Sequence, residues 1–157
     1  MEKLNCSVYE ITDSVEKILA DGALLPLYVS GSSMNPFLIS RRDIVYLNKI
    51  CDSDFKKEKI ILFKRSNGNF VLHRIKKVLP DGILLMNGDA QTWTETVNKK
   101  QVIAVVSEIE RKGKRKSAES LYWRAVNCFW SFLSPFRSLI MRVWFKVRRI
   151  KNNNHSE

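Results

Sequence analysis

The sequence predicts a mainly β fold: a small antiparallel β domain with a short helix before it and an amphipathic helical segment after it. Two observations support this prediction. Short apolar runs rich in β-branched and aromatic residues follow one another up to residue 109, separated by turn signals and without helical segments between them. Beyond residue 118 the pattern changes to a basic, aromatic stretch with helical periodicity.

A short helix is expected over residues 14–21. Asp13 is placed to cap its first turn, and Glu16, three positions later, fits the partner position of a capping box. Apolar residues within the segment line one side, and Gly22 follows as a stop signal. The helix is therefore expected to precede the first strand.

Six strands are expected after this helix. They are the apolar runs at 25–30, 44–48, 60–64, 69–78, 83–86 and 102–109. The turn sequences Ser-Asn-Gly-Asn at 66–69 and Pro-Asp-Gly at 80–82 separate consecutive runs in the manner of antiparallel hairpins. A small antiparallel sheet or half-barrel follows from this pattern.

The positive charge of the chain is concentrated after residue 110. Residues 1–110 hold 15 Lys/Arg and 14 Asp/Glu, whereas residues 111–151 hold 12 Lys/Arg against Glu119 alone. A cationic, glycine-containing hexamer at 111–116 repels itself and is expected to act as a hinge. The predicted organisation is a β domain over 1–110, a basic hinge over 111–118, an amphipathic helix over 119–151 and a disordered tail over 152–157.

Neither a metal nor a cofactor is expected. Cys6, Cys51 and Cys128 lie far apart and have neither CxxC nor Cys/His spacing. The first residues lack a positively charged start followed by an apolar stretch, so neither a signal peptide nor a signal anchor is expected there. Any membrane contact is then expected through the C-terminal end.

Residues 29–36, Val-Ser-Gly-Ser-Ser-Met-Asn-Pro, are the candidate for chemistry. A predicted strand ends here in small residues, so a serine is presented where the backbone leaves the sheet. A nucleophilic hydroxyl needs such a position, with backbone N–H groups nearby to bind an oxyanion. A Gly-Ser-Ser triplet taken alone is more often an ordinary turn, with Met34 filling a gap in the core.

This segment resembles the serine box of the type I signal peptidases and of the related LexA-like self-cleaving peptidases, Ser-Gly-x-Ser-Met-x-Pro or Gly-x-Ser-Met. The matching serine is Ser33, directly before Met34 and three positions before Pro36. The resemblance implies that Ser33 attacks the scissile carbonyl and that Met34 supports the site. It further implies that backbone N–H groups such as that of Ser33 hold the oxyanion, with Ser30 or Ser32 as helpers. As in the LexA-like branch, Gly31 stands where signal peptidases often have a serine that lines the oxyanion hole.

A second box is expected to supply the general base. Val-Leu-His-Arg-Ile at 71–75 is similar to the His-Arg-Val segment of archaeal and endoplasmic-reticulum signal peptidases, where bacterial forms have Lys-Arg-Val. The resemblance implies that His73 is the base, and an imidazole with its ordinary pKa near 6.5 suits that task. The alternative is a core histidine that shares its strand face with Val71 and Ile75.

A third box is expected to orient the histidine. Met-Asn-Gly-Asp-Ala-Gln at 86–91 resembles the Gly-Asp-Asn segment of the same family and places Asp89 on its aspartate. A carboxylate on the second imidazole nitrogen fixes the tautomer and stabilises the imidazolium. Histidine-type members also carry an acidic residue about six positions further on, which here is Glu95. Asp89 is preferred for its closer motif match, Glu95 is the alternative, and a plain Asn-Gly-Asp turn is the non-functional interpretation.

Residues 121–150 form the basic, aromatic segment. At 100° per residue its polar side chains fall on one narrow stripe beside a wide apolar face. Its longest charge-free run, 125–136, has twelve residues against the roughly 20 that span a bilayer, so an interfacial helix kinked at Pro135 is expected. The residues expected to bind membrane are Trp123, Arg124, Phe129, Trp130, Arg137, Arg142 and Trp144. The alternative is a helix that packs on the β domain or on a second subunit.

The function expected from these features is that of a membrane-associated serine endopeptidase resembling signal peptidase I, which cleaves signal or leader-like peptides by acyl transfer. Its expected partners are a secreted or leader-bearing protein substrate and a membrane surface. Nucleic acid is not expected, because a continuous Phe/Trp face favours lipid. The alternatives are a LexA-like self-cleaving regulatory protease and a non-catalytic membrane-binding β module. Substrate sequence, membrane face and oligomeric state are not specified by these patterns.

Overall fold

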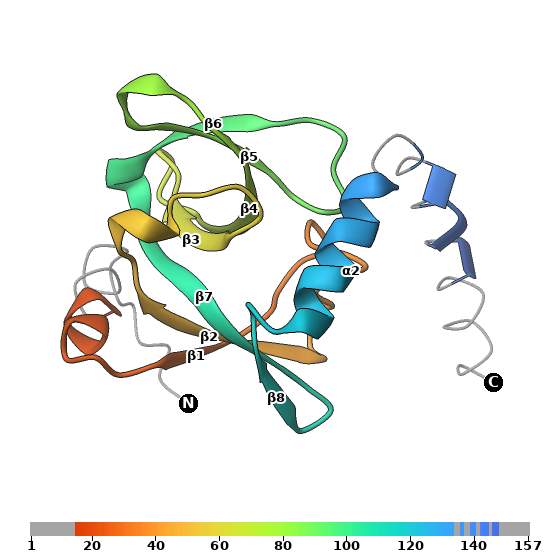
Figure 1. Ribbon diagram of the computed structural model, residues 1–157, viewed down its shortest axis with the longest axis horizontal. Coiled ribbons are helices and arrows are strands. Elements are labelled where there is room, and N and C mark those ends of the chain that lie inside the picture. Colours follow the sequence, from red (N-terminus) through yellow and green to blue (C-terminus); the bar gives the residue numbers. More distant parts are fainter. Residues whose placement is uncertain (1–14, 134–135, 137–138, 141, 145, 148–157) are drawn as a thin grey trace. The chain divides into compact units, whose positions relative to one another are not determined.

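The computed structural model describes residues 15–133, 136, 139–140, 142–144 and 146–147, apart from the side chains of Asn127 and Ser131 (Figure 1). The chain divides into two compact units, Met1–Ser120 and Leu121–Glu157. The first unit contains the sheet and the second contains helix α2, Leu121–Phe132. The expected capping residue Asp13 and the expected disordered tail 152–157 lie outside the described residues.

The first unit is built on one antiparallel sheet, which confirms the mainly β prediction. Its strands pair in the order β1-β2-β7-β3-β4-β5-β6, and β8 pairs with β7. The strand bounds are β1 Leu25–Tyr28, β2 Asp43–Lys49, β3 Ile60–Lys64, β4 Phe70–Val78, β5 Ile83–Asn87, β6 Glu95–Asn98, β7 Val102–Arg111 and β8 Lys114–Ser117. Short 3-10 helices occupy Asp52–Asp54, Pro80–Gly82 and Lys99–Gln101, and residues 15–20 form the expected short helix.

All six predicted strands are present, and both predicted hairpins are confirmed. The turn after β3 joins it to β4, and Pro80–Gly82 joins β4 to β5. Two strands, β6 and β8, were not predicted. The sequence Glu-Thr-Val-Asn of β6 carries one apolar residue, Val97, and Lys-Arg-Lys-Ser of β8 carries none, so neither shows an apolar run.

One face of the curled sheet seen in Figure 1 carries a cluster of buried apolar side chains. Strand alternation places every second side chain of β3 on this side. Ile61 and Phe63 of β3 are fully buried and pack with Ile75 of β4 and with apolar residues from β5, β6 and β7. The members of this cluster are Ile61, Phe63, Ile75, Leu84, Met86, Val97 and Val105.

The expectation of a basic hinge at 111–118 is wrong, because these residues form a β-hairpin. Lys112 and Gly113 both have positive φ, 53° and 72°, the backbone that a two-residue turn between antiparallel strands requires. The cationic side chains find partners on neighbouring strands: Arg115 pairs with Glu108 and stacks 3.6 Å over the ring of Tyr46. The boundary between the two units accordingly falls at Ser120, after the hairpin.

The second unit is helical where it is described. Residues 121–132 form α2, and residues 139–140, 142–144 and 146–147 are also helical, in agreement with a helical C-terminal segment. The expected kink at Pro135 lies outside the described residues. Within the part of the chain that is described, no helix is long and apolar enough to cross a membrane.

Candidate active site

Ser33 lies in the loop that leaves β1 and leads to β2. Gly31, two residues earlier, has φ of 79°, the left-handed region that glycine adopts without strain, so the chain can turn sharply before the serine. Ser33 is half-buried, whereas the neighbouring Ser32 is exposed. Met34 is buried, as its expected supporting role requires, and the amide of Leu38 donates to its carbonyl at 2.8 Å.

Ser33 contributes to the wall of a pocket of about 350 Å³. The wall is mainly apolar, with a few polar groups at the serine and at Arg65, which is the usual composition of a ligand site. The lining residues come from the β1 loop, β3, β4 and the turn after β5: Leu27, Tyr28, Val29, Ser30, Ser33, Met34, Leu62, Arg65, Phe70, Val71, Leu72 and Gln91.

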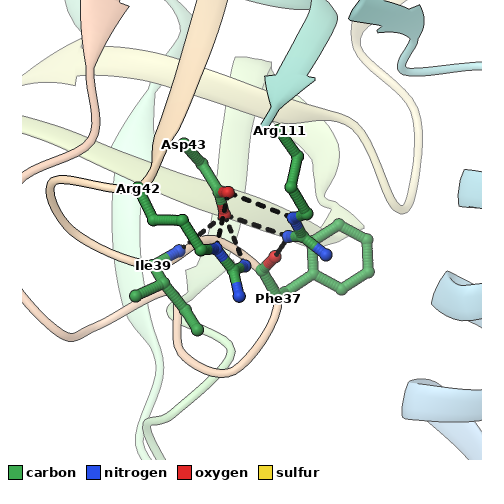
Figure 2. A network of polar contacts seen from close by, with 5 residues as sticks. All are labelled: Phe37, Ile39, Arg42, Asp43 and Arg111. Atoms are coloured by element: carbon green, nitrogen blue, oxygen red, sulfur yellow. Dashed lines mark hydrogen bonds and ion pairs between the residues drawn. The ribbon is translucent and has the colours of Figure 1, made fainter. Parts of the chain in front are cut away.

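The far end of the serine loop is fixed by the buried carboxylate of Asp43 at the start of β2. Figure 2 shows Arg42 and Arg111 converging on this carboxylate, each through two hydrogen bonds of 2.8–3.0 Å. The amide of Ile39 donates to it at 2.9 Å, and Arg111 also donates to the carbonyl of Phe37. These arginines hold the pKa of Asp43 below its usual value despite burial. The network ties the loop to β7 through charge-assisted bonds.

The turn after β5 fixes the serine end of the loop. The amide of Ala90 donates to the carbonyl of Ser33 at 2.8 Å. Gly88 lies so close that a Cβ atom placed on it would be 2.6 Å from the same carbonyl oxygen. The Asn-Gly-Asp segment expected as the third box therefore lies directly against the serine backbone.

His73 is a buried residue of β4, only 1% exposed. Its ring is 6.0 Å from the ring of Phe63 in the core and 6.5 Å from that of Trp93, measured between centroids. Its Nδ1 lies 2.8 Å from Oε1 of Glu95 at the start of β6. The residue thus combines a core position with a charged partner.

Glu95 is shared between His73 and Arg65. Nε of Arg65 donates to Oε2 at 2.8 Å, and Nη2 donates to Oε1 at 2.7 Å. The same Oε1 atom therefore faces both the guanidinium and the imidazole. These two hydrogen bonds, called the Arg65 fork below, hold the carboxylate in a fixed plane beside the histidine.

Asp89 does not contact His73, which corrects the preferred assignment of the orienting carboxylate. Its two oxygens accept from Nε and Nη2 of Arg74 at 2.9 and 2.8 Å, and both side chains are buried. The ring of Phe37 lies 4.5 Å from the same guanidinium. Arg74 is a cation inside the fold, so it needs the aspartate as its counter-charge, and the alternative Glu95 is left as the carboxylate beside His73.

The electrostatic surroundings favour a neutral imidazole. Burial lowers the pKa of His73 below its ordinary value, and the positive charge of Arg65 adds to that effect, while Glu95 and Asp89 oppose it. Arg65 and His73 lower the pKa of Glu95 although its partial burial acts the other way. At neutral pH the pair is therefore an ionised carboxylate beside an uncharged base.

β4 contributes to the Ser33 pocket through residues next to the histidine, whereas His73 itself is not one of the residues that line it. Val71 and Leu72, the two residues before His73 on β4, line the pocket together with Ser33. Among the residues that the structure describes, no hydrogen bond joins the Ser33 hydroxyl to His73. In free enzymes such catalytic contacts often close only when substrate binds.

The residues expected to bind membrane divide into two groups. Arg124, Phe129 and Arg142 are exposed and Trp144 is half-buried, whereas Arg137 lies outside the described residues. Trp123 and Trp130 are only 3% and 8% exposed. They are seven positions apart, which is two helical turns, so they share one face of α2. Their expected contact with lipid stays a prediction.

Sequence reasoning assigned no role to Arg65, Arg74, Asp43 or Arg111. For Arg74 a usable signal exists: an arginine within an apolar strand must find a buried acid, and the nearest motif acid is Asp89. For Arg65, the signal is weak, because a residue in a polar turn is usually solvated. The pairs Arg65–Glu95 and Arg74–Asp89 each join residues that are distant in the sequence. The sequence does not show that the strands carrying them lie side by side.

No metal site is suggested by the described part of the chain, where no three His, Cys, Asp or Glu side chains come close enough to share an ion. Compared with known proteins, the chain matches no family model, no curated protein and no solved structure.

Proposed function

We propose that this protein is a serine endopeptidase of the signal-peptidase type, with Ser33 as nucleophile, His73 as general base and Glu95 as the carboxylate that supports the base. One observation carries the proposal. Three segments far apart in the sequence lie close together: the turn at Gly88–Ala90 is bonded to the Ser33 backbone, and β4, whose Val71 and Leu72 line the Ser33 pocket, also carries the buried His73 beside Glu95.

The proposed chemistry is acyl transfer. Nε2 of neutral His73 takes the proton of the Ser33 hydroxyl as Oγ attacks the peptide carbonyl, and the imidazolium then gives that proton to the leaving amine. Water hydrolyses the acyl-enzyme by the same route in reverse order. Glu95 stabilises the transient imidazolium, which is the role of the third member of such a triad.

The serine loop suits this chemistry because it is held at both ends. Asp43 fixes it to β2 and β7, and Ala90 fixes the Ser33 carbonyl. A loop fixed in this way presents its N–H groups in constant positions, and pre-organised donors stabilise an oxyanion more than mobile ones. The pocket beside Ser33 would receive apolar side chains of the substrate.

Membrane association is part of the proposal. Large apolar side chains of α2 are exposed, among them Leu121 at 81%, Phe129 at 64% and Phe132 at 78%. Arginines at 124 and 142 are also exposed. Exposed aromatic side chains combined with cations are the features of a helix that lies in the headgroup region of a bilayer.

Peptide profiling in the native host tests the proposal. Cells carrying the wild-type chain are compared with cells carrying Ser33→Ala, and newly formed protein N-termini are identified by mass spectrometry. The expected result is a set of N-termini that depends on Ser33 and whose sequences identify the substrate class.

Ser32→Ala is the matched control, because Ser32 is the adjacent, exposed serine of the same loop. It should leave the profile unchanged. Identical profiles for wild type and Ser33→Ala, at equal protein levels, contradict a peptidase acting on other chains.

A further inference from the structure

Arg65 is placed by the turn that joins β3 to β4. Its amide donates to the carbonyl of Asn69 at 2.9 Å, and its carbonyl accepts from the amide of Gly68 at 2.9 Å. Both backbone groups of the arginine are therefore used inside a closed turn. The side chain accordingly starts from a fixed point at the end of β3.

The Arg65 side chain connects two parts of the candidate site. Its guanidinium holds Glu95 through two hydrogen bonds, and one of the bonded oxygens is the atom that faces Nδ1 of His73. The same side chain lines the pocket that contains Ser33, and it is 32% exposed there. No other described residue both binds Glu95 and lines this pocket.

We propose that Arg65 is a positioning residue, which fixes the Glu95 carboxylate against His73 and links this pair to the wall of the Ser33 pocket. The inference rests on the proposed function for its catalytic consequence. Among the described residues, the side-chain hydrogen bonds of Arg65 go to Glu95 and none goes to Ser33 or His73, so Arg65 acts through Glu95. Without the fork, the carboxylate is free to rotate away from the imidazole or to approach it more closely.

The charges that face His73 come from three elements. Glu95 of β6 and Asp89 after β5 are negative, and Arg65 after β3 is positive. The remaining neighbours on β3 and in the loop before β6 are the uncharged rings of Phe63 and Trp93. When the positive charge of Arg65 is removed, the carboxylates of Glu95 and Asp89 are the remaining charges that act on His73. His73 is therefore expected to bind a proton more tightly.

An NMR titration of the His73 imidazole tests the inference in full-length protein. It is carried out in the Ser33→Ala background, so that no turnover is needed, and His155→Gln assigns the signals because the chain has only two histidines. Arg65→Met should raise the proton affinity of His73 about threefold, a modest change because solvent screens a partly exposed charge. Arg65→Lys, which keeps the charge but loses the fork, should leave it within about twofold of the wild-type value.

Kinetics on the active protein give the second readout. Arg65→Lys should lower kcat with little change in KM, whereas Arg65→Met should also move the acidic limb of kcat/KM to higher pH. Lys77→Met, at an exposed cation of β4, is the charge-matched control and should change neither quantity.

The inference is overturned if Arg65→Met leaves the His73 titration unchanged or lowers its proton affinity while the amide spectrum shows an intact fold. The failure of the proposed function is a separate outcome. A wild-type protein that cleaves nothing but shows the expected NMR shifts retains the Arg65–Glu95–His73 linkage and loses the peptidase.

Discussion

Oε1 of Glu95 lies 2.8 Å from Nδ1 of His73, whereas the carboxylate of Asp89 is bound on both oxygens by Arg74. Two acids six positions apart in the sequence therefore have different partners, an imidazole and a guanidinium. Glu95 lies beside a buried imidazole. Asp89 compensates a cation that would otherwise be buried without a partner.

Substitution of these two acids should separate catalysis from stability. Glu95→Gln is expected to lower kcat/KM by about 100-fold or more, because the imidazolium loses its counter-charge, with little loss of stability. Asp89→Asn is expected to lower the free energy of unfolding by about 3 kcal/mol, because Arg74 is left uncompensated inside the protein. Peptide-cleavage kinetics and urea unfolding on the same samples measure both effects.

The reverse outcome would support the assignment, favoured by motif similarity, of Asp89 as the carboxylate that orients His73. If Asp89→Asn abolished turnover without affecting the urea midpoint, and Glu95→Gln were nearly neutral, Asp89 would be the functional carboxylate. Asp21→Asn, at an exposed acid of the same unit, serves as a control for loss of one negative charge.

The buried histidine should make stability depend on pH. The pKa of His73 in the folded protein is below its ordinary value of 6.5 because of burial. The unfolded chain therefore binds a proton at a pH where the folded protein does not, and stability is lost as pH falls from 6.5 toward the folded pKa. Unfolding free energies measured between pH 7.5 and pH 5 should show this decline, and His73→Gln should lack that part of it. Equal slopes for both proteins would show that His73 titrates alike in the two states.

Much of the fold could be predicted from the sequence, because strands such as Ile60–Lys64 and Val102–Arg111 carry apolar residues that only a sheet core can bury. The strand Lys114–Ser117 could not, since its residues are all charged or polar. It forms because Lys112-Gly113 turns the chain back on β7, where Glu108 can pair with Arg115. At such a sheet edge, hydrogen bonding to an existing strand outweighs the low β-propensity of the residues themselves.

The candidate site was predictable in its residue types but only partly in its contacts. Ser33, His73 and an acid were expected together, and motif similarity favoured Asp89. Which acid faces the histidine depends on Arg74, one residue after His73 on β4, and on the cost of burying its charge. Likewise, helical periodicity predicted an apolar face of α2 but did not distinguish the exposed Phe129 from Trp123 and Trp130, which are only 3% and 8% exposed.

The close approach of Gly88 to the serine loop predicts a strong effect of one methyl group. In Gly88→Ala the new Cβ would meet the Ser33 carbonyl oxygen at 2.6 Å and the Gln91 side chain at 2.8 Å, so the loop must move. We expect kcat/KM to fall more than tenfold and stability to fall by about 1–3 kcal/mol. Cleavage assays and thermal unfolding measure the two effects.

Gly22→Ala is the contrasting substitution. A Cβ at Gly22 meets nothing within 4 Å, but φ of 76° makes alanine strained there. It should cost about 1 kcal/mol of stability and leave the activity of the folded protein intact. A Gly88→Ala protein that is fully active would contradict the tight contact between the third box and the serine loop.

The exposed phenylalanines of α2 should govern membrane binding. Replacing Phe129 and Phe132 together with serine is expected to lower partitioning into anionic vesicles about tenfold or more, because two large apolar side chains no longer enter the lipid. Co-sedimentation with vesicles of phosphatidylcholine and phosphatidylglycerol measures this, with Ala125→Ser, at another exposed position of α2, as the control. Binding that survives the double change but disappears in high salt would assign the attraction to the cations.

Cleavage of synthetic leader-like peptides by the purified full-length chain tests the central claim most directly. Wild type, Ser33→Ala, Ser32→Ala and His73→Gln are compared with vesicles present, and products are identified by mass spectrometry. The account predicts the same cleavage by wild type and Ser32→Ala, and none by Ser33→Ala or His73→Gln. Cleavage that persists in Ser33→Ala would contradict the account.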